Sequence, residues 1–573
     1  MPFTSVPLIS SIILYFIVVM MAPLSLTLLM NNYSIIMEWS ITNISSPISL
    51  TLIADPYGTL LSIVVLLISA NVMIFTHSYM SEDPFMSRFV ILVLLFVASM
   101  NLLIFIPNLI TLLIGWDGLG LTSFLLVIYY QNPKSLGAGM ITALTNRIGD
   151  VLILISIAWT LNIGNWNLLY LSSSPFLPMI SVALMVAAMT KSAQMPFSSW
   201  LPAAMAAPTP VSALVHSSTL VTAGVFLLFR FYPFLSSFLW FNKLLLMVAT
   251  LTTLMAGLSA NTECDMKKII ALSTLSQLGV MMVSLGLGCP LLAFFHLITH
   301  ALFKALLFLC AGTLIHLHHH SQDLRYMGNL PKQAPSIIAP MMVSNLALCG
   351  APFLAGFYSK DAILEYSLFS PTSFIIIILF FFATGLTVSY TIRFLLVVAW
   401  GPSNISPFHP INDNDFSNSL PTFTLAFLAI IGGSSLNWIL VCPNQELFLT
   451  PFLKNLTISV CLLGLIFGYY LSSTLSSQRS FLLVNPMINS FSTTMWFLTP
   501  LSAQKSLSLP MSLALLFHKT LDQGWEESFG GQGALSLTLS SGSFSMLPQS
   551  NMISSQLSIC FFSLPILIML FYM

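Results

Sequence analysis

Charged side chains are scarce in this sequence. Only 6% of its 573 residues are Asp, Glu, Lys or Arg, against about 25% in ordinary soluble domains. The 17 basic and 17 acidic residues balance, so no basic excess predicts binding to nucleic acid. Because 57% of the residues are hydrophobic and apolar runs long enough to cross a bilayer recur along the chain, a soluble protein is excluded.

Motifs for redox groups and metals are also missing. The seven cysteines are scattered and none forms a CxxC pair, so disulfides, zinc sites and iron–sulfur clusters are not expected. The sequence contains no dinucleotide-binding fingerprint and no haem motif, so electron transfer cannot be located on this chain. Four neighbouring histidines lead into a polar segment, and we interpret them as a solvated loop and not as a metal site: His316, His318, His319 and His320. We therefore predict no cofactor and no metal on the chain itself.

The spacing of the apolar runs predicts the fold class. Runs of roughly 20 residues, separated by Pro, Gly, Asn and Ser, indicate about 14 to 16 membrane helices with short connections. The segment 477–549 differs because it is rich in Ser, Leu and Gly and carries several charges. It is typical of an interfacial helix with loops, while an ordinary loop between two spans is the alternative. The sequence thus predicts an all-α polytopic membrane protein.

Several charges fall inside apolar segments, where each costs at least about 2.5–3.5 kcal/mol. Asp117 lies between two apolar stretches and needs a cation nearby. Lys191 is followed by Pro196, which removes a backbone donor and interrupts the helix. Broken helices at membrane depth usually line a site. We therefore interpret Lys191 as a site residue, with a side chain that extends to the membrane interface as the alternative.

A second lysine lies beside helix-disrupting residues. Lys360 and Asp361 follow the segment 350–356, which contains two glycines and a proline. The arrangement is similar to Lys191 with Pro196. Two interrupted helices that each carry a lysine indicate an internally repeated transporter.

Two opposite charges lie three residues apart in another apolar segment. Arg147 and Asp150 can neutralise each other on one helix face. A structural ion pair is the favoured interpretation, and a role in a functional site is the alternative.

Histidines and a lysine form a stripe in a further segment. His296, His300 and Lys304 recur every four residues, which places them along roughly 12 Å of one helix face. Three titratable groups on one apolar helix predict a ladder for protons. His216 lies among small hydroxyl residues that could hold water beside its imidazole, although a lone histidine is more often a packing residue.

Several of these motifs resemble the antiporter-like subunits of respiratory complex I. The similarity covers nearly the whole chain and is carried by the segments 116–120 (WDGLG), 146–150 (NRIGD), 191–197, 200–202, 207–216, 296–305, 356–361 and 524–527 (GWEE). Thirty Met and forty-four Phe, with few Lys, favour an organelle-encoded product over a bacterial one.

The resemblance implies a fold of about 16 transmembrane helices. It places N-terminal helices in 1–106, two inverted five-helix repeats in 107–260 and 261–400, and further helices in 401–476. A lateral helix along the membrane arm would lie in 477–549, and an anchoring helix in 550–573.

The resemblance also implies roles for the buried charges. Asp117 and Lys191 would form an ion pair in one half-channel, and Lys360 with Asp361 would lie in the other. The central hydrophilic axis would consist of His216, His296, His300 and Lys304. Many members of the family carry Glu at the position of Asp117, which is shorter by one methylene, so a bridging water is the alternative to direct contact.

The implied function is proton translocation in the membrane arm of complex I, in the mitochondrial inner membrane. NADH, FMN, iron–sulfur clusters and ubiquinone would bind to partner subunits, whose redox energy drives the protons. The implied partners are neighbouring antiporter-like subunits along the lateral helix and membrane lipid. Two alternatives are a subunit of a bacterial multi-subunit cation/proton antiporter, which segment 524–527 and the last span disfavour, and a non-conducting structural membrane anchor.

Overall fold

The computed structural model describes residues 5–43, 47–164, 166–167, 176–402, 415–440, 448–476, 486–546, 549 and 552–572. The chain divides into two units, Met1–Thr499 and Pro500–Met573. Cys442 and residues 477–485 of the predicted interfacial segment lie outside the described residues.

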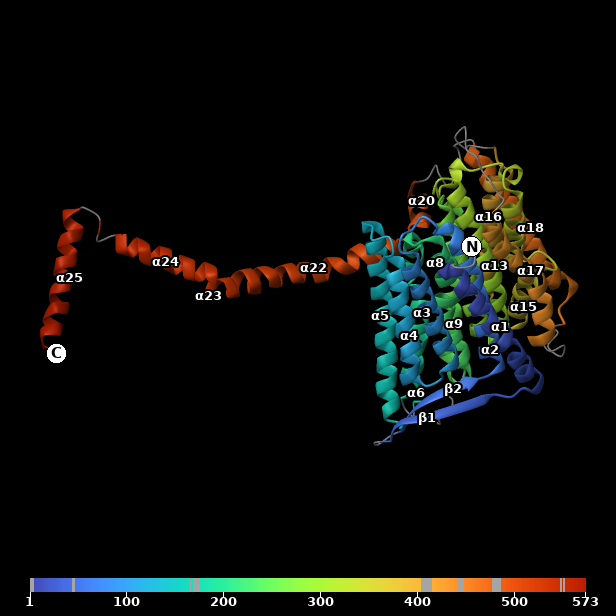
Figure 1. Cartoon of the computed structure of the whole chain (residues 1–573), viewed down its shortest axis with the longest axis horizontal. Coiled ribbons are helices and arrows are strands. Elements are labelled where there is room, and N and C mark those ends of the chain that lie inside the picture. The colour runs from blue at the N-terminus through green and yellow to red at the C-terminus, as the bar shows by residue number, and fades with distance from the viewer. Residues whose placement is uncertain are drawn as a thin grey trace. The chain divides into compact units, whose positions relative to one another are not determined.

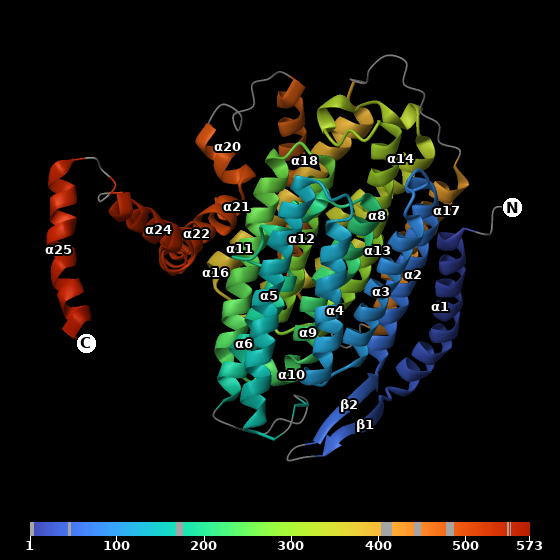
Figure 2. The same ribbon diagram turned by 60° about the vertical axis from the view of Figure 1, so that its left-hand side comes forward.

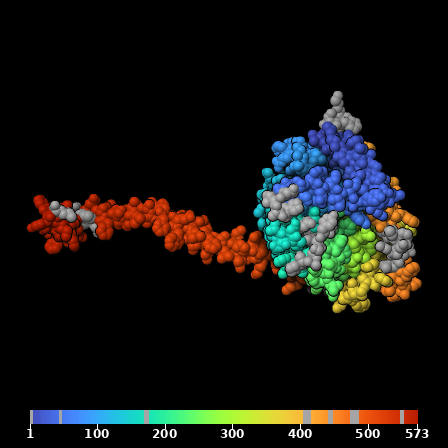
Figure 3. All heavy atoms as spheres, turned by 90° about the horizontal axis from the view of Figure 1, so that it is seen from below, coloured from blue at the N-terminus to red at the C-terminus, as the bar shows by residue number. Residues whose placement is uncertain are grey.

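Unit 1 starts with two helices that a β-hairpin connects. Helix α1 (Val6–Asn31) packs against α2 (Pro56–Tyr79), and strands β1 (Ile35–Asn43) and β2 (Pro47–Ala54) lie between them in the sequence. The strands pair antiparallel from Ile35 opposite Ala54 to Asn43 opposite Pro47. The hairpin lies at one end of the helices and forms part of the surface there (Figures 1 and 3). The all-α prediction missed this hairpin, whose strands are rich in the β-branched residues Ile and Thr that favour extended backbone.

The helices of unit 1 stand side by side (Figures 1 and 2). Those of its first half are α3 (Met86–Phe105), α4 (Leu109–Val127), α5 (Pro133–Leu161), α6 (Leu177–Lys191), α7 (Trp200–Ala203), η2 (Ala204–Ala206), α8 (Thr209–Val211), η3 (Ser212–Thr219), α9 (Leu220–Arg230) and α10 (Tyr232–Leu235). Prolines begin several of them, since the first turn of a helix needs no backbone donor: α5 has Pro133 and α6 has Pro178 in the first turn.

The second half of unit 1 is built around α13. Its elements are α11 (Leu239–Thr262), α12 (Met266–Gly286), α13 (Pro290–Leu317), η4 (Leu324–Tyr326), η5 (Leu330–Lys332), α14 (Pro335–Cys349), α15 (Ala355–Phe369), α16 (Phe374–Leu395), η6 (Leu396–Trp400), α17 (Phe416–Leu440), α18 (Pro451–Ser476), α20 (Pro486–Thr493) and α21 (Leu498–Pro500). Helix α13 contacts α2, η3, α12, α14, α15 and α17. It therefore lies inside the bundle, where any charge on it must find polar partners within the protein.

Thirteen helices in the described part of the chain are long and apolar enough to cross a membrane. Two further apolar helices, α6 and α14, are shorter. Within the described residues, the long helices are thus fewer than the predicted number of about 16; α6 and α14 are short because each ends where the chain leaves the helical conformation.

Unit 2 is almost entirely helical. It consists of η8 (Leu501–Lys505), α22 (Ser506–Phe517), η9 (His518–Glu526), α23 (Glu527–Phe529), α24 (Gly531–Met546) and α25 (Ile553–Tyr572). None of its described residues is buried. This unit therefore has no core of its own, which suits a segment that packs against lipid or other chains.

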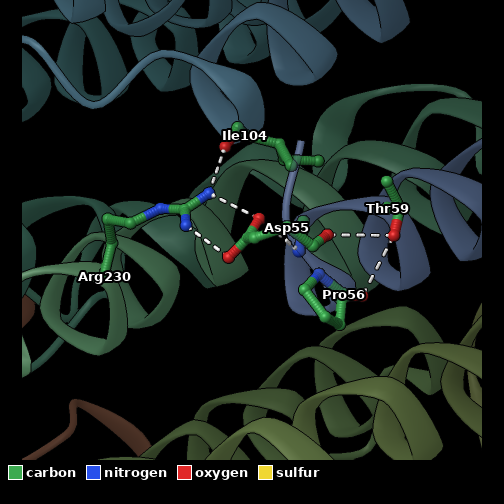
Figure 4. Close-up of polar contacts among 6 residues, drawn as sticks. Asp55, Pro56, Thr59, Ile104 and Arg230 are labelled. Atoms are coloured by element: carbon green, nitrogen blue, oxygen red, sulfur yellow. Dashed lines mark hydrogen bonds and ion pairs between the residues drawn. The ribbon is translucent and has the colours of Figure 1, made fainter. Parts of the chain in front are cut away.

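An ion pair and the hydrogen bonds around it link the end of the hairpin to helices α2, α3 and α9 (Figure 4). Asp55 follows β2 and caps α2, since its carboxylate accepts from the backbone of Gly58 at 3.0 Å. Arg230, the last residue of α9, donates to both oxygens of Asp55 at 2.5 and 3.2 Å and to the carbonyl of Ile104 at 2.9 Å. One arginine thus joins the hairpin, the start of α2, the end of α3 and the end of α9.

Candidate functional site

Lys191 is the last residue of α6, and its side chain is completely buried. Its ammonium donates to the backbone carbonyl of Trp116 on α4 at 2.6 Å. The same nitrogen lies 3.8 Å from the centre of the Trp116 ring, a distance at which the ring face attracts a cation. Trp116 therefore holds Lys191 with both its backbone and its side chain.

Asp117 is half-buried next to this contact. The ion pairs of the described residues do not include one between Asp117 and Lys191, although the resemblance implied it. Lys191 instead contacts Trp116. One oxygen of Asp117 is buried and makes no hydrogen bond within the described protein, so it needs a water or a movement of Lys191.

Asp150 on α5 also belongs to this cluster. The indole N–H of Trp116 donates to Asp150 at 2.8 Å, while Arg147 lies 3.5 Å from the other oxygen with an exposed side chain. The carboxylates of Asp150 and Asp117 are both close enough to Lys191 to favour its charged form. The predicted pair with Arg147 is present, but Asp150 has a second role as a neighbour of Lys191.

The close approach of α5 and α6 requires a glycine next to Asp150. A Cβ atom at Gly149 would collide with the hydroxyl of Thr190, the residue before Lys191. The absence of a side chain at this position lets the two helices meet. Gly149 thereby places Asp150 beside Lys191.

The backbone leaves the helix directly after Lys191. Ala193 has a positive φ of 54°, which is uncommon for a residue with a side chain. The Trp200 indole donates to the Thr190 carbonyl at 3.0 Å, and Thr252 donates to the Gln194 side chain at 2.7 Å. Pro196 lies in this non-helical segment, which is fixed to α7 and α11.

His216 lies in a short π-helix. All eight residues of η3 are buried, and neither ring nitrogen of His216 has a hydrogen-bond partner in the described part of the chain. Ser217 and Ser218 donate to carbonyls of their own helix and not to the imidazole. Buried nitrogens are rarely left unpaired, so water is the expected partner of His216.

The predicted stripe on α13 is buried along its whole length. The two ring nitrogens of His296 lie 2.9 Å from the hydroxyl of Ser359 on α15 and 3.2 Å from the Gln277 side-chain oxygen on α12. Lys304 donates to the hydroxyl of Ser273 on α12 at 2.6 Å. Between them, His300 has no hydrogen-bond partner in the described residues, so the middle of the stripe needs water most.

Lys360 on α15 is buried beside the end of α14. It donates to the Thr387 hydroxyl on α16 at 2.8 Å and lies 3.4 and 3.5 Å from the carbonyls of Leu348 and Cys349. Those carbonyls are available because α14 ends at Gly350, which has a φ of 85° that glycine adopts without strain. A cation at this helix end is also favoured by the helix dipole.

Asp361 lies on a different side of α15 from Lys360. Its carboxylate faces Thr457 and Lys454 of α18. Consecutive residues of a helix point apart, so the two predicted residues do not form one contact pair among the described ion pairs.

The histidines at the end of α13 differ in part from the predicted solvated loop. His316 lies within the helix and packs against Tyr79 and His320. His316, His319 and His320 are exposed, whereas His318 is buried. The prediction of a solvated loop is therefore wrong for His316, because the helix continues to Leu317, and for His318, because its side chain is buried.

The sequence analysis missed the uncharged partners of the buried charges. Ser273 and Gln277 are four residues apart in an apolar segment, as are His296 and His300. This spacing could have indicated a polar stripe on one face of the helix. Single hydroxyls in apolar helices give no such indication, because they usually bond to their own helix. The contacts that were missed come from Trp116, Ser273, Gln277, Ser359 and Thr387.

Three family models match the chain. They are described as NADH-Ubiquinone oxidoreductase (complex I), chain 5 N-terminus, over residues 39–90; NADH:quinone oxidoreductase/Mrp antiporter, TM, over 107–387; and NADH dehydrogenase subunit 5 C-terminus, over 390–572. Together they include every buried charge of the site.

Curated relatives and solved structures agree with these matches. The chain is 55% identical to NADH-ubiquinone oxidoreductase chain 5 of Lumbricus terrestris over 90% of both chains, and 49% identical to that of Aedes aegypti over 91% of this chain and 90% of the relative. Its fold is similar to a chain of the Mrp complex from Dietzia sp., with a TM-score of 0.70 and 24% identity over 96% of this chain and 59% of that longer one. A chain of an archaeal membrane-bound sulfane sulfur reductase gives a TM-score of 0.67 and 19% identity over 82% of this chain and 94% of that one.

Proposed function

This chain belongs to the family of NADH-ubiquinone oxidoreductase chain 5, and from that premise we propose that it moves protons across the membrane through its buried Asp, Lys and His residues. It is an antiporter-like, multi-pass subunit of complex I in the mitochondrial inner membrane. Its identity to chain 5 relatives disfavours the alternative of a bacterial cation/proton antiporter subunit, with whose structures it shares only the fold.

The Lys191 cluster holds or releases a proton according to the position of its carboxylates. Burial favours the neutral amine, whereas a nearby carboxylate favours the ammonium. In the present arrangement Lys191 is bonded to Trp116 and is near Asp150 and Asp117. A movement of either carboxylate away from Lys191 would favour loss of its proton toward His216.

The central axis receives that proton and passes it to the second half of the chain. His216, His296, His300 and Lys304 are all buried, and Lys360 with Asp361 would form the exit. The single observation that carries the proposal is that His216 and His300 have four ring nitrogens without a protein partner in the described residues. Such groups require water, and a hydrated row of titratable groups can conduct protons.

The energy for this transfer comes from other subunits. Moving a charge against the membrane potential costs about 2.3 kcal/mol per 100 mV, and we assign NADH, FMN, iron–sulfur clusters and ubiquinone to partner subunits of the complex. Neighbouring antiporter-like subunits along segment 477–549, together with lipid, would cover the exposed surface of unit 2.

Two inverted repeats in 107–260 and 261–400 would explain the paired helix breaks. Each contains a short apolar helix, α6 or α14, that ends beside a buried lysine. The similarity to a chain of the Mrp complex supports this assignment of the fold.

Methionine substitutions of two of the buried lysines, Lys191 and Lys304, test the proposal. Lys191→Met and Lys304→Met keep the length of the side chain and remove its charge, so we expect assembled complex with strongly reduced proton translocation per NADH oxidised. Lys332→Met, at an exposed position in η5, serves as the control. Normal proton stoichiometry in both buried variants, in fully assembled complex, would favour the structural membrane anchor instead.

A further inference from the structure

Tyr390 on α16 is a buried tyrosine that the proposed path does not use. Its side chain is 2% exposed, and its hydroxyl lies 3.1 Å from the hydroxyl of Ser276 on α12. The same hydroxyl faces Ser273 and Gln277. One turn of α12 therefore surrounds the tyrosine hydroxyl with three polar side chains.

Two of these side chains, Ser273 and Gln277, also bind residues of the α13 stripe. Ser273 accepts from Lys304 at 2.6 Å, and the Gln277 oxygen lies 3.2 Å from His296. Lys304 and His296 are eight residues apart, about 12 Å along the helix. Tyr390 thus lies beside Ser273 and Gln277, the polar partners of Lys304 and His296.

The direction of the hydrogen bond to Ser276 can be derived. A serine hydroxyl has one proton, and that of Ser276 already goes to the Ser273 carbonyl at 2.8 Å. Tyr390 is therefore the donor to Ser276. Its oxygen lone pairs remain available to accept a proton from the side of Ser273.

Helix α16 also contacts Lys360, the buried lysine on α15. Thr387, three residues before Tyr390, accepts from Lys360 at 2.8 Å. Residues three apart on a helix lie on the same face, about 5–6 Å from one another. Tyr390 and Thr387 therefore place two hydroxyls of one helix near the partner of Lys304 and near the amino group of Lys360.

We propose that Tyr390 relays a proton from Lys304 to Lys360, along a hydroxyl route that runs beside the histidines. The inference rests on the proposed function and adds to it a residue and a route. In a concerted transfer the tyrosine hydroxyl gains one proton as it loses another and so stays neutral, unlike an imidazole that holds an extra proton, which suits a position that is buried in apolar surroundings.

Each bond that forms along this route is matched by one that breaks. A proton leaves the Lys304 ammonium for the oxygen of Ser273, and the original hydroxyl proton of Ser273 passes to Tyr390. The hydroxyl proton of Tyr390 passes through a water to the neutral amine of Lys360. Ser273 donates to the Ile270 carbonyl at 2.7 Å and Tyr390 donates to Ser276, so both hydroxyls must rotate first, and each hydroxyl then gives up its own proton as it receives the next one. The net change is the loss of one proton by Lys304 and the gain of one by Lys360.

The test uses the assembled complex, reconstituted in sealed vesicles, with Tyr390→Phe. This change removes only the hydroxyl, and positioned proton donors contribute about 10²–10⁴-fold to a transfer step. We expect Tyr390→Phe to lower the number of protons translocated per NADH oxidised. The decrease should be at least half of the decrease that Lys304→Met causes. Tyr15→Phe is the matched control, because it removes a hydroxyl that donates to Asn71 at 2.8 Å between α1 and α2, away from the stripe.

Ser273→Ala blocks the entrance of the same route and is the second variant. Residues that act in series give losses that do not add, so we expect the double variant to match the single ones. If Tyr390→Phe does not assemble, Ser273→Ala alone decides by the same measurement.

The results separate the relay from the proposed function. Unchanged translocation in Tyr390→Phe and Ser273→Ala, with strong loss in Lys304→Met, would overturn the relay alone. Unchanged translocation in Lys304→Met would overturn the proposed function and the relay with it. Losses in Tyr390→Phe and Ser273→Ala that add fully would also overturn the relay, since they would indicate two separate packing defects.

Discussion

Asp150 makes its shorter hydrogen bond to Trp116 and not to the arginine on its own helix. The bond from the Trp116 indole is 2.8 Å, whereas the Arg147 guanidinium is 3.5 Å away. Arg147 has an exposed side chain, so water or a neighbouring chain can solvate it. Asp150 is therefore only weakly neutralised by Arg147 and can act on Lys191, its other basic neighbour.

This difference predicts unequal effects of neutralising the two residues. We expect Asp150→Asn to slow proton translocation by roughly tenfold or more, the scale of a positioned acid or base. Arg147→Gln should have a much smaller effect, because an exposed ion pair contributes only about 0–1 kcal/mol. Proton translocation in vesicles that contain each variant complex is the measurement. Equal losses would favour a purely structural ion pair.

The buried lysines and histidines could be predicted from the sequence, but their contacts could not. Apolar residues on both sides of Lys191 and Lys304 indicate burial directly, because a charge at that depth must be inside the protein. The partner of Lys191 is a backbone carbonyl, which every residue has and no pattern distinguishes. The partner of Lys304 is one serine hydroxyl among many. Such contacts depend on how helices pack against one another. The periodicity of a single helix gives no information about that packing.

At the scale of elements, the crossing of α5 and α6 depends on one glycine. A Cβ at Gly149 would collide with Thr190, whereas a Cβ at Gly137 on the same helix would meet nothing within 4 Å. The two positions differ only in what faces them, so they form a matched pair on α5.

We predict opposite effects of Gly149→Ala and Gly137→Ala on stability. Overpacking a helix contact costs typically about 1–3 kcal/mol, and the resulting shift would move Asp150 from Lys191. Gly137→Ala should be neutral or stabilising, since Ala is favoured over Gly in a helix by about 1 kcal/mol. Thermal unfolding of the two variant complexes tests this. Equal midpoints would show that α5 and α6 can separate at no cost.

Among the elements, long apolar runs predicted the helices well, and the exceptions have local causes. The hairpin was missed although residues 48–52 of β2 alternate between apolar and polar side chains, the pattern typical of a strand, because only apolar runs long enough for membrane helices were considered. The early end of α14 at Gly350 arises from a positive φ, and the glycine in that segment did indicate it. The ends of α6 and α14 lower the number of long spans but create the positions that Lys191 and Lys360 occupy.

At the scale of the whole molecule, the pair of Asp55 and Arg230 connects segments that are 175 residues apart. No spacing rule reaches across such a distance, so the sequence analysis could not find it. The two side chains are 12% and 11% exposed, and Arg230 also donates to Ile104. The contact fixes the end of α9, the helix that continues directly from the π-helix of His216.

We predict that Asp55→Asn destabilises the protein strongly. Removing one partner of a buried ion pair costs about 3–5 kcal/mol, because the remaining charge is left uncompensated. The control is Asp323→Asn, since Asp323 also caps a helix and pairs with an arginine, Arg325, whose side chain is 68% exposed. Exposed pairs contribute about 0–1 kcal/mol, so only Asp55→Asn should lower the thermal midpoint of the complex markedly. Similar shifts in both variants would mean that water reaches Arg230 as easily as Arg325, and that the hairpin is not held to α9 by this contact.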